Sequence, residues 1–349
     1  MSERRPAVPL QSVIDPAGWR AAEVKQASIF PLDDGHIAEL DAALASVERK
    51  GVAIENITQA DFPLDRLAAL MGEIRRTLMD GLGFVLMRNF PVERYSRRQA
   101  VAAYWGLGTY LGSAVMQNAL GHMLGHVKDL GHDKNDPNYR NYHTSQDIDF
   151  HADKCDIVGL LCLQTAKAGG ESRIVSSITV YNEMLKRRPD LVAEMVKPLY
   201  RDRRGEVPAG KEPWYTLPMF CFQDGYLSVR GGSLFVKSAQ RFAEVPRLSP
   251  AQLEALDLLQ ELSIECSLDM DFHPGDIQFL HNHVILHART EYEDWPDEGR
   301  KRHLLRLWLN TDSAGSVQGI RRPLTPEFAE AVKGVVIETA RPNVPLDAE

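Results

Sequence analysis

The sequence contains few cysteines and no long hydrophobic run. Its 349 residues include four cysteines, well separated and without a CxxC pair, so neither a disulfide framework nor a cysteine zinc site is expected. The first twenty residues are charged and lack the apolar core that a secretory signal requires. No uninterrupted apolar stretch approaches the roughly 18 residues of a membrane span. We therefore expect a cytoplasmic protein without a membrane partner.

The chain also lacks an excess of positive charge. It has 40 Lys and Arg against 48 Asp and Glu, a formal net charge of −8. This balance argues against a nucleic-acid partner, because binding to the phosphate backbone requires a basic surface. The negative net charge does not exclude a local basic pocket for a small anion. The sequence does not indicate the oligomeric state, so a homo-oligomer is left open.

No Gly-, Ser- or Pro-rich linker and no internal repeat divides the chain, which favours a single domain over 1–349. We expect a helix-rich front over 1–110, a catalytic β-rich core over about 140–312, and a C-terminal extension over 313–349. In the front part, leucines and other apolar residues recur at helical spacing between Leu64 and Leu78. Gly81 is placed to end that helix, a buried strand is expected over 83–91, and a further helix over 94–111.

The second half shows signals for strands. Asp224-Gly225 separates two β-prone runs, 220–223 and 226–229, which predicts a hairpin. Ser249 begins a capping-box pattern with proline at the first helical position. Alternating apolar residues predict strands at 268–272, 277–279 and 302–309. A helical front and a sheet-rich back indicate a mainly β protein with flanking helices, either α+β or an elaborated β-barrel.

Two histidines and a carboxylate form a candidate metal site. In an extended segment, His151 and Asp153 point to the same side and can reach one metal ion. His287, 136 residues later at the end of a β-prone run, is the candidate third ligand. Two His and one carboxylate form the facial triad of non-haem Fe(II) oxygenases. The HxD pattern is common by chance, so the neighbouring motifs must support it.

Other histidines compete for the metal role. His283 and His287 are four residues apart, as are His122 and His126. The HVILH segment lacks the glutamate of the HExxH zinc motif and favours a strand. His122 and His126 lie among glycines, which favours a structural or substrate-contacting role. We expect His281 and His283 to pack or to support the ligands.

The strand expected at 302–309 carries two arginines on one face. Arg302 and Arg306 share this face with Leu304 and Trp308. A guanidinium on an apolar face requires an anion, and it binds a carboxylate in a bidentate manner, so a dicarboxylate cosubstrate fits. The alternative is an exposed edge strand with solvated arginines.

Taken together, these segments resemble the taurine dioxygenase (TauD/TfdA-like) family of Fe(II)/2-oxoglutarate-dependent oxygenases, including its clavaminate-synthase-like members. The match over roughly 140–310 follows the family order: HxD, a GG[DE][ST] turn, HxR[ST] and RxxxR. These motifs correspond here to His151 and Asp153, Gly169 to Ser172, His287 to Thr290, and Arg302 with Arg306.

The resemblance implies a double-stranded β-helix, or jelly-roll, core. It implies that His151, Asp153 and His287 ligate Fe(II), and that Arg302, with Ser172, binds the distal carboxylate of 2-oxoglutarate. O2 would be the other cosubstrate. The retained carboxylate at Asp153 argues against halogenation, because related halogenases replace it with a small residue.

The implied reaction is oxidation of an unactivated C–H bond, by hydroxylation, desaturation or cyclisation, with release of succinate and CO2. Arg306 matches a position that contacts substrate or assists the cosubstrate. Arg289, Gln146 and Arg140 are weaker candidates for substrate binding. The expected substrate is a small or medium polar molecule that can carry an anionic group. Two alternatives stay open: a metal-dependent cupin-like hydrolase or isomerase, and a non-catalytic ligand-binding module on the same fold.

Overall fold

A computed structural model describes residues 3–24, 27–131, 141–311 and 322–348. Its larger sheet has seven strands in the order β1-β2-β14-β6-β17-β3, with β4 also paired to β17. All of these pairings are antiparallel except β1 with β2. The strands span Ile29–Pro31 (β1), Phe84–Arg88 (β2), Ser113–Ala114 (β3), Leu124–Val127 (β4), Ile157–Gln164 (β6), Ile277–His281 (β14) and His303–Asn310 (β17).

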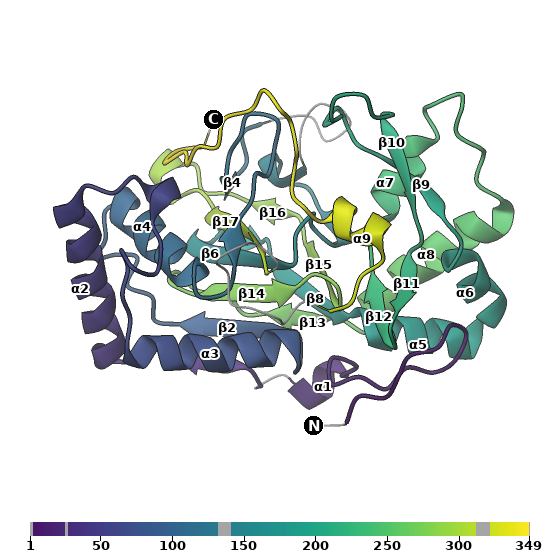
Figure 1. The fold of residues 1–349 in the computed structure, drawn as a ribbon, viewed down its shortest axis with the longest axis horizontal. Helices are drawn as coiled ribbons and strands as arrows, with labels where there is room; N and C mark the ends of the chain where they lie inside the picture. The colour runs from purple at the N-terminus through teal and green to yellow at the C-terminus, as the bar shows by residue number, and fades with distance from the viewer. Residues whose placement is uncertain (1–2, 25–26, 132–140, 312–321, 349) are drawn as a thin grey trace.

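A second, four-stranded antiparallel sheet has the order β13-β8-β15-β5. Together the two sheets form the expected jelly-roll core within a mixed α+β protein (Figure 1). The strands of the smaller sheet span Ile148–His151 (β5), Ser172–Ser176 (β8), Leu268–Met270 (β13) and Ile285–Arg289 (β15). Short two-stranded pairs complete the strands: Ala168–Gly169 (β7) with Tyr292–Glu293 (β16), Leu199–Asp202 (β9) with Trp214–Leu217 (β10), and Phe220–Gln223 (β11) with Tyr226–Val229 (β12).

One group of helices covers the larger sheet on the left of Figure 1. Its members are Asp34–Lys50 (α2), Arg66–Met79 (α3) and Arg97–Gly108 (α4). The apolar stripe of α3 is buried, as the leucine spacing predicts. On β17, Leu305, Leu307 and Leu309 pack into the same hydrophobic cluster as these helices. The opposite face of β17 is therefore free to line the interior between the sheets.

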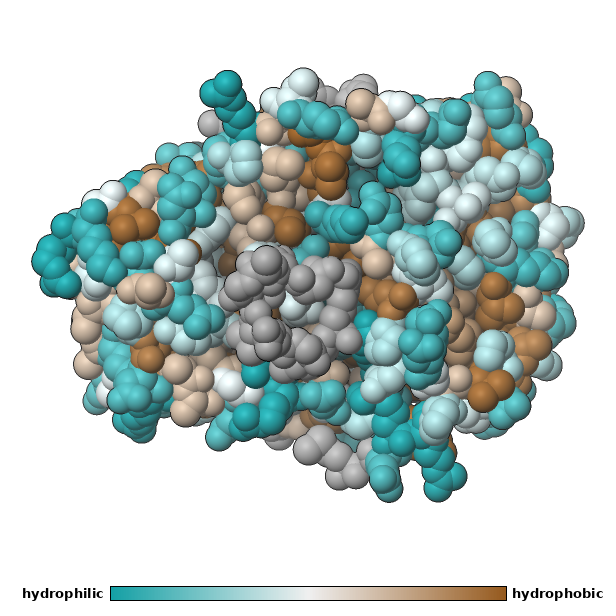
Figure 2. Space-filling view, viewed as in Figure 1, coloured by the Kyte–Doolittle hydropathy of each residue, from teal (hydrophilic) through white to brown (hydrophobic). Residues whose placement is uncertain are grey.

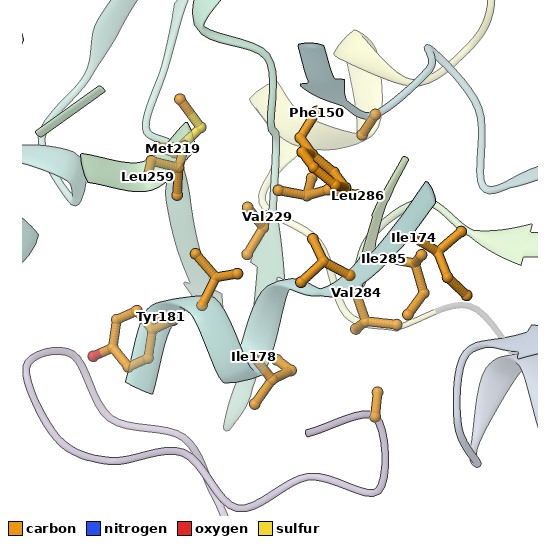
Figure 3. Packing of buried hydrophobic residues seen from close by; sticks show 14 of the residues in the cluster. Phe150, Ile174, Ile178, Tyr181, Met219, Val229, Leu259, Val284, Ile285 and Leu286 are labelled. Atoms are coloured by element: carbon orange, nitrogen blue, oxygen red, sulfur yellow. The ribbon is translucent and has the colours of Figure 1, made fainter. Parts of the chain in front are cut away.

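A second group of helices packs beside the smaller sheet. It contains Ser177–Arg187 (α5), Pro189–Met195 (α6), Ser233–Ala239 (α7) and Pro250–Glu265 (α8). Figure 3 shows their hydrophobic cluster, in which Ile178 of α5 lies toward Val284, and Tyr181 lies at the opposite end from Ile285. The remaining helical turns are Ala21–Val24 (α1), Pro326–Ala331 (α9), Ile54–Asn56 (η1), Asn141–His143 (η2) and Glu298–Arg300 (η3).

Several local predictions agree with the structure. β11 and β12 pair as a hairpin, and Asp224 and Gly225 both have positive φ, as a tight two-residue turn requires. Ser249 caps α8 with the predicted capping box. Other boundaries differ by one to three residues: the strand expected over 83–91 spans 84–88, and the helix expected over 94–111 spans 97–108. α3 ends at Met79 before Gly81, and β17 begins at His303, so Arg302 lies directly before the strand.

The two ends of the chain contact the core. The Arg322 guanidinium pairs with Asp15 at 2.5 Å, and both side chains are buried. The C-terminal part also pairs Asn343 with His122 in a β-bridge.

On the face in Figure 2, hydrophobic residues form small groups among hydrophilic ones. Within the described residues, no helix is long and apolar enough to cross a membrane. The division into one domain over 1–349 stays a prediction.

Candidate active site

The smaller sheet brings the three candidate metal ligands together. His151 is the last residue of β5, His287 lies in the middle of the adjacent strand β15, and the two are register partners. Their ring centroids are 4.2 Å apart. Asp153 follows two residues after His151, just beyond the end of the strand. Strand pairing therefore brings together residues that are 136 positions apart in the sequence.

The geometry of these three side chains fits a single metal ion. His151 Nε2 is 3.9 Å from Asp153 Oδ1, and His287 Nε2 is 3.8 Å from Asp153 Oδ2. One ligand atom from each residue lies within 4.8 Å of the other two. His151 Nδ1 donates to the carbonyl of Asp149 at 2.9 Å. This hydrogen bond leaves the Nε2 lone pair available to a metal.

The protonation states also fit a divalent cation. Burial alone would raise the pKa of Asp153, but Arg306, His287 and His151 outweigh it and hold the pKa at about 2. Burial, with the neighbouring His151, lowers the pKa of His287 to about 3. Burial likewise lowers the pKa of His151. A carboxylate and two neutral imidazoles are the forms in which these side chains bind a metal.

Three further side chains hold the Asp153 segment in place. Trp308 Nε1 donates to Asp153 Oδ2 at 2.8 Å, and Arg306 Nη1 lies 3.5 Å from Oδ1. Arg230 Nη1 donates to the backbone carbonyls of Ala152 and Asp153. The sequence placed Trp308 on the correct face of its strand but gave no signal for Arg230.

A cavity of about 330 Å³ contains the triad, and Arg302, Leu304, Arg306 and Trp308 all line it. This confirms the predicted face of the 302–309 segment. Arg302 is only 4% exposed. Its Nη2 donates to the carbonyl of Gly170 at 3.3 Å, whereas Nη1 has no hydrogen-bond partner among the described residues. A buried guanidinium with an unused donor fits a carboxylate ligand such as that of 2-oxoglutarate.

Ser172 and Arg289 line the same cavity. Ser172 is buried, and its hydroxyl lies 3.4 Å from Gln278 Oε1. The two glycines before it, at 169 and 170, both have positive φ. Arg289 donates to the backbone carbonyls of Thr144 and Gln146, so it also fixes the segment that leads into β5.

Arg306 is positioned by residues that sequence reasoning missed. Its Nε donates to Gln117 Oε1 at 2.9 Å, and its guanidinium lies 4.3 Å from the Tyr142 ring centroid. Gln117 in turn donates to the Arg306 carbonyl. These residues lie more than 160 positions before Arg306, and neither belongs to a motif, so no sequence signal pointed to them.

Gln146 and Arg140 are the remaining candidates for substrate binding. The Gln146 side chain is exposed, and Gln146 is not among the described residues that line the cavity. Arg140 lies outside the described residues. The substrate-binding roles of Arg306, Arg289, Gln146 and Arg140 stay predictions.

The rival histidines make other contacts. His126 Nδ1 is 2.8 Å from His303 Nε2, and His283 Nε2 is 2.9 Å from Asp156 Oδ1. His281 is fully buried against the carbonyl of Leu78. Among the described residues, the group found with metal-binding geometry is His151, Asp153 and His287.

The jelly-roll core, the triad and the buried Arg302 define a non-haem Fe(II)- and 2-oxoglutarate-dependent dioxygenase, with O2 as the other cosubstrate. Comparison with known proteins supports this class. The profile described as "Taurine catabolism dioxygenase TauD, TfdA family" matches residues 49–308. The chain belongs to this family, as its motifs indicated. Membership favours the dioxygenase over the hydrolase, isomerase and non-catalytic alternatives.

Three named relatives align with most of the chain. FR-33289 synthase of Streptomyces rubellomurinus (strain ATCC 31215) is 32% identical over 308 residues, covering 84% of this chain and 89% of the relative. The taurine hydroxylase-like protein SAT17 of Stachybotrys chartarum is 29% identical, covering 79% and 73%. Uridine-5'-phosphate dioxygenase of Amycolatopsis sp is 24% identical, covering 80% and 91%.

Solved structures share the fold. Asparagine oxygenase, with Fe(II), hydroxyasparagine and succinate, has a TM-score of 0.62 at 16% identity, covering 81% of this chain and 94% of that one. The non-haem iron oxygenase OrfP, with Fe and α-ketoglutaric acid, has a TM-score of 0.60 at 16% identity and the same coverage. At this identity the likeness concerns the fold.

Proposed function

We propose that the protein oxidises an unactivated C–H bond of a small or medium polar molecule that carries an anionic group, releasing succinate and CO2. Hydroxylation is the reaction we favour; desaturation and cyclisation begin with the same C–H cleavage. The observation that carries the proposal is the cavity, which joins the His151–Asp153–His287 triad to the buried guanidinium of Arg302.

Each residue has a separate role in this reaction. His151, Asp153 and His287 would hold Fe(II), and Arg302, with Ser172 nearby, would hold the distal carboxylate of 2-oxoglutarate. When bound, Fe(II) together with 2-oxoglutarate and O2 would supply the oxidising chemistry, which the side chains cannot supply. Trp308 and Arg306 keep the Asp153 carboxylate ionised and oriented. The cavity walls aim one C–H bond of the substrate and exclude the others.

The anionic group is supported by charge and by the relatives. Arg306 is buried beside the triad, and a buried guanidinium at a ligand cavity favours an anion. One relative is named for a uridine phosphate, and another resembles a taurine hydroxylase. Both names refer to small polar compounds with an acidic group.

The test is a panel of small anionic compounds, scored by substrate-dependent succinate formation and by product mass. We expect one compound class to couple succinate formation to a product 16 mass units heavier, or two lighter for desaturation or cyclisation. Arg306→Ala should weaken substrate binding, whereas Arg302→Ala should weaken 2-oxoglutarate binding. If Arg306→Ala weakened binding of 2-oxoglutarate and left substrate affinity unchanged, the anionic-substrate proposal would lose its main support.

A further inference from the structure

A second cavity, of about 240 Å³, lies behind Arg302. Ala166, the turn at Gly169 and Gly170, and Arg302 itself are among the residues that line this rear cavity. Arg302 and Leu304 also line the larger cavity, which contains the metal triad. The two side chains therefore form a partition, with the expected 2-oxoglutarate site on one side and the rear cavity on the other.

The rear cavity leaves space next to a buried guanidinium. Arg302 is 4% exposed, and a Cβ built on Gly170 would lie 2.9 Å from its Nε. Glycine at this position and alanine at position 166 keep the wall of the rear cavity thin. Protein interiors normally leave few voids around a side chain. A guanidinium with a cavity behind it can shift in a way that a side chain packed on all sides cannot.

The contacts of Arg302 hold its backbone more firmly than its guanidinium. The backbone amide donates to Asp294 Oδ1 at 2.7 Å. The Nη2 atom donates to the Gly170 carbonyl at 3.3 Å, which is long for a hydrogen bond. The guanidinium lies 5.2 Å from the centroid of the Tyr292 ring, and it forms no ion pair with the described residues. A small displacement of the guanidinium therefore breaks one weak hydrogen bond.

Two carboxylates make the rear cavity acceptable to a cation. Glu171 and Asp271 line it, and both residues are exposed. Glu171 accepts from the Thr290 hydroxyl, which is the main reason why its pKa is lowered, and nearby arginines, Arg302 among them, contribute smaller effects. Asp271 lies 3.6 Å from His273. Because water screens exposed charges, these carboxylates favour the approach of Arg302 without fixing it in the rear cavity.

The distance between the metal triad and Arg302 limits the length of the 2-oxo acid. The triad lies on β5, on β15 and just after β5, whereas Arg302 lies directly before β17 of the other sheet. A guanidinium packed from behind would exclude a longer acid. Since the rear cavity allows the guanidinium to step back, the site can lengthen while the sheets stay in place.

Resting on the proposed function, we propose that the protein also accepts 2-oxoadipate, which is one methylene longer than 2-oxoglutarate, as its cosubstrate. The Arg302 guanidinium moves toward the rear cavity and keeps its contact with the distal carboxylate. In the reaction, 2-oxoadipate loses CO2 and becomes glutarate. One oxygen atom of O2 enters the new carboxylate of glutarate, and the other enters the substrate as its hydroxyl group. The balance is the same as for 2-oxoglutarate and succinate.

Anaerobic titration of the full chain compares the two acids by binding alone. The protein is loaded with Fe(II) and titrated by its charge-transfer band, or loaded with Mn(II) and titrated by calorimetry. We expect 2-oxoadipate to bind within ~10-fold of 2-oxoglutarate. The monoacid 2-oxohexanoate has the chain length of 2-oxoadipate but no distal carboxylate. It should bind at least ~10-fold more weakly than 2-oxoadipate, because it forms no charged hydrogen bond with Arg302.

Ala166→Leu tests the rear cavity directly, because it fills this space away from the metal ligands. It should weaken 2-oxoadipate binding by ~10-fold and leave 2-oxoglutarate binding within ~2-fold of the wild type. Unchanged 2-oxoglutarate binding also shows that the variant is folded. Ala168→Leu is the matched control, since Ala168 is an exposed residue of β7 that is not among the described residues lining the rear cavity. It should change neither affinity.

Three results would overturn the proposal. The first is a wild type that binds 2-oxoadipate more than ~10-fold less tightly than 2-oxoglutarate. The second is 2-oxohexanoate binding as tightly as 2-oxoadipate, which would show that Arg302 does not hold the longer acid. The third is an Ala166→Leu variant that affects both acids alike or neither. Failure of the wild type to bind 2-oxoglutarate would instead contradict the proposed function.

Discussion

The indole of Trp308 donates a hydrogen bond of 2.8 Å to the Asp153 carboxylate, although the two residues are 155 positions apart. Trp308 lies on β17 of the larger sheet, and Asp153 follows β5 of the smaller sheet. The bond therefore connects the two sheets at the metal site. It occupies one oxygen of the carboxylate and restricts the direction in which Asp153 faces the two histidines.

Replacement of Trp308 should weaken metal binding without unfolding the protein. Trp308→Phe keeps an aromatic ring but removes the donor, and loss of such an outer hydrogen bond typically costs about 10- to 100-fold in metal affinity. The measurement is anaerobic Fe(II) or Mn(II) titration. Trp295→Phe is the control, because Trp295 stacks with Arg300 instead. Equal metal affinity in wild type and Trp308→Phe would refute the role assigned to this bond.

A methyl group at position 170 should disturb the 2-oxoglutarate site. Gly170 has a φ of +75°, and a Cβ there would lie 2.9 Å from Arg302 Nε. Gly170→Ala should displace the guanidinium and weaken 2-oxoglutarate binding, with little change in metal affinity. Gly210→Ala controls for backbone strain, because Gly210 has a φ of +69° with nothing within 4 Å of its Cβ position. The idea fails if both variants bind 2-oxoglutarate as tightly as the wild type.

The buried ion pair of Asp15 and Arg322 should make stability depend on pH. Burial would raise the pKa of Asp15, but Arg322, the Ala17 amide and Arg4 outweigh burial and lower it. A depressed folded-state pKa stabilises the protein above the unfolded-state value and loses this contribution as the pH falls through the folded-state value. Asp15→Asn should cost about 3–5 kcal/mol at pH 7, because it leaves Arg322 buried without its carboxylate.

Urea unfolding of wild type and Asp15→Asn checks this expectation. The difference in unfolding free energy should be large at neutral pH and should shrink below about pH 4, where the Asp15 carboxyl of the unfolded chain begins to take up a proton. A difference that stays constant from pH 7 to pH 3 would show that the pair does not act through its charge.

The cap of α8 gives a purely local prediction. The Ser249 hydroxyl accepts from the Gln252 amide at 3.1 Å, and the Gln252 side chain accepts from the Ser249 amide at 3.0 Å. Ser249→Ala should lower the unfolding free energy by about 1 kcal/mol, as measured by thermal or urea unfolding. Ser249→Asp retains an acceptor and should recover most of the loss; equal stability of the Ala and Asp variants would argue against the cap.

Sequence reasoning succeeded where the signal was local. The DG hairpin, the Ser249 cap and the stripe of α3 each depend on residues within a few positions of one another, so propensity and periodicity specify them. The face of the 302–309 segment followed from the two-residue period of a strand. Boundaries were less accurate, because they depend on hydrogen bonds made at the ends of each element.

Contacts between distant segments were beyond sequence reasoning. The motif order pointed to the candidate iron ligands and to the two arginines, because the family pattern places them. Gln117 beside Arg306 and Arg230 beneath Asp153 have no such pattern. Their positions depend on how both sheets and α7 pack around the cavity, which a single sequence does not specify.

The central claim is that His151, Asp153 and His287 hold an iron that binds 2-oxoglutarate near Arg302. Anaerobic visible spectroscopy of the metal-free protein, with Fe(II) and then 2-oxoglutarate added, tests it most directly. We expect a weak charge-transfer band that requires both additions. The band should be absent in His151→Ala, and in Arg302→Ala it should appear only at higher 2-oxoglutarate concentration. A folded wild-type protein that binds Fe(II) but gives no band at any 2-oxoglutarate concentration would contradict the account.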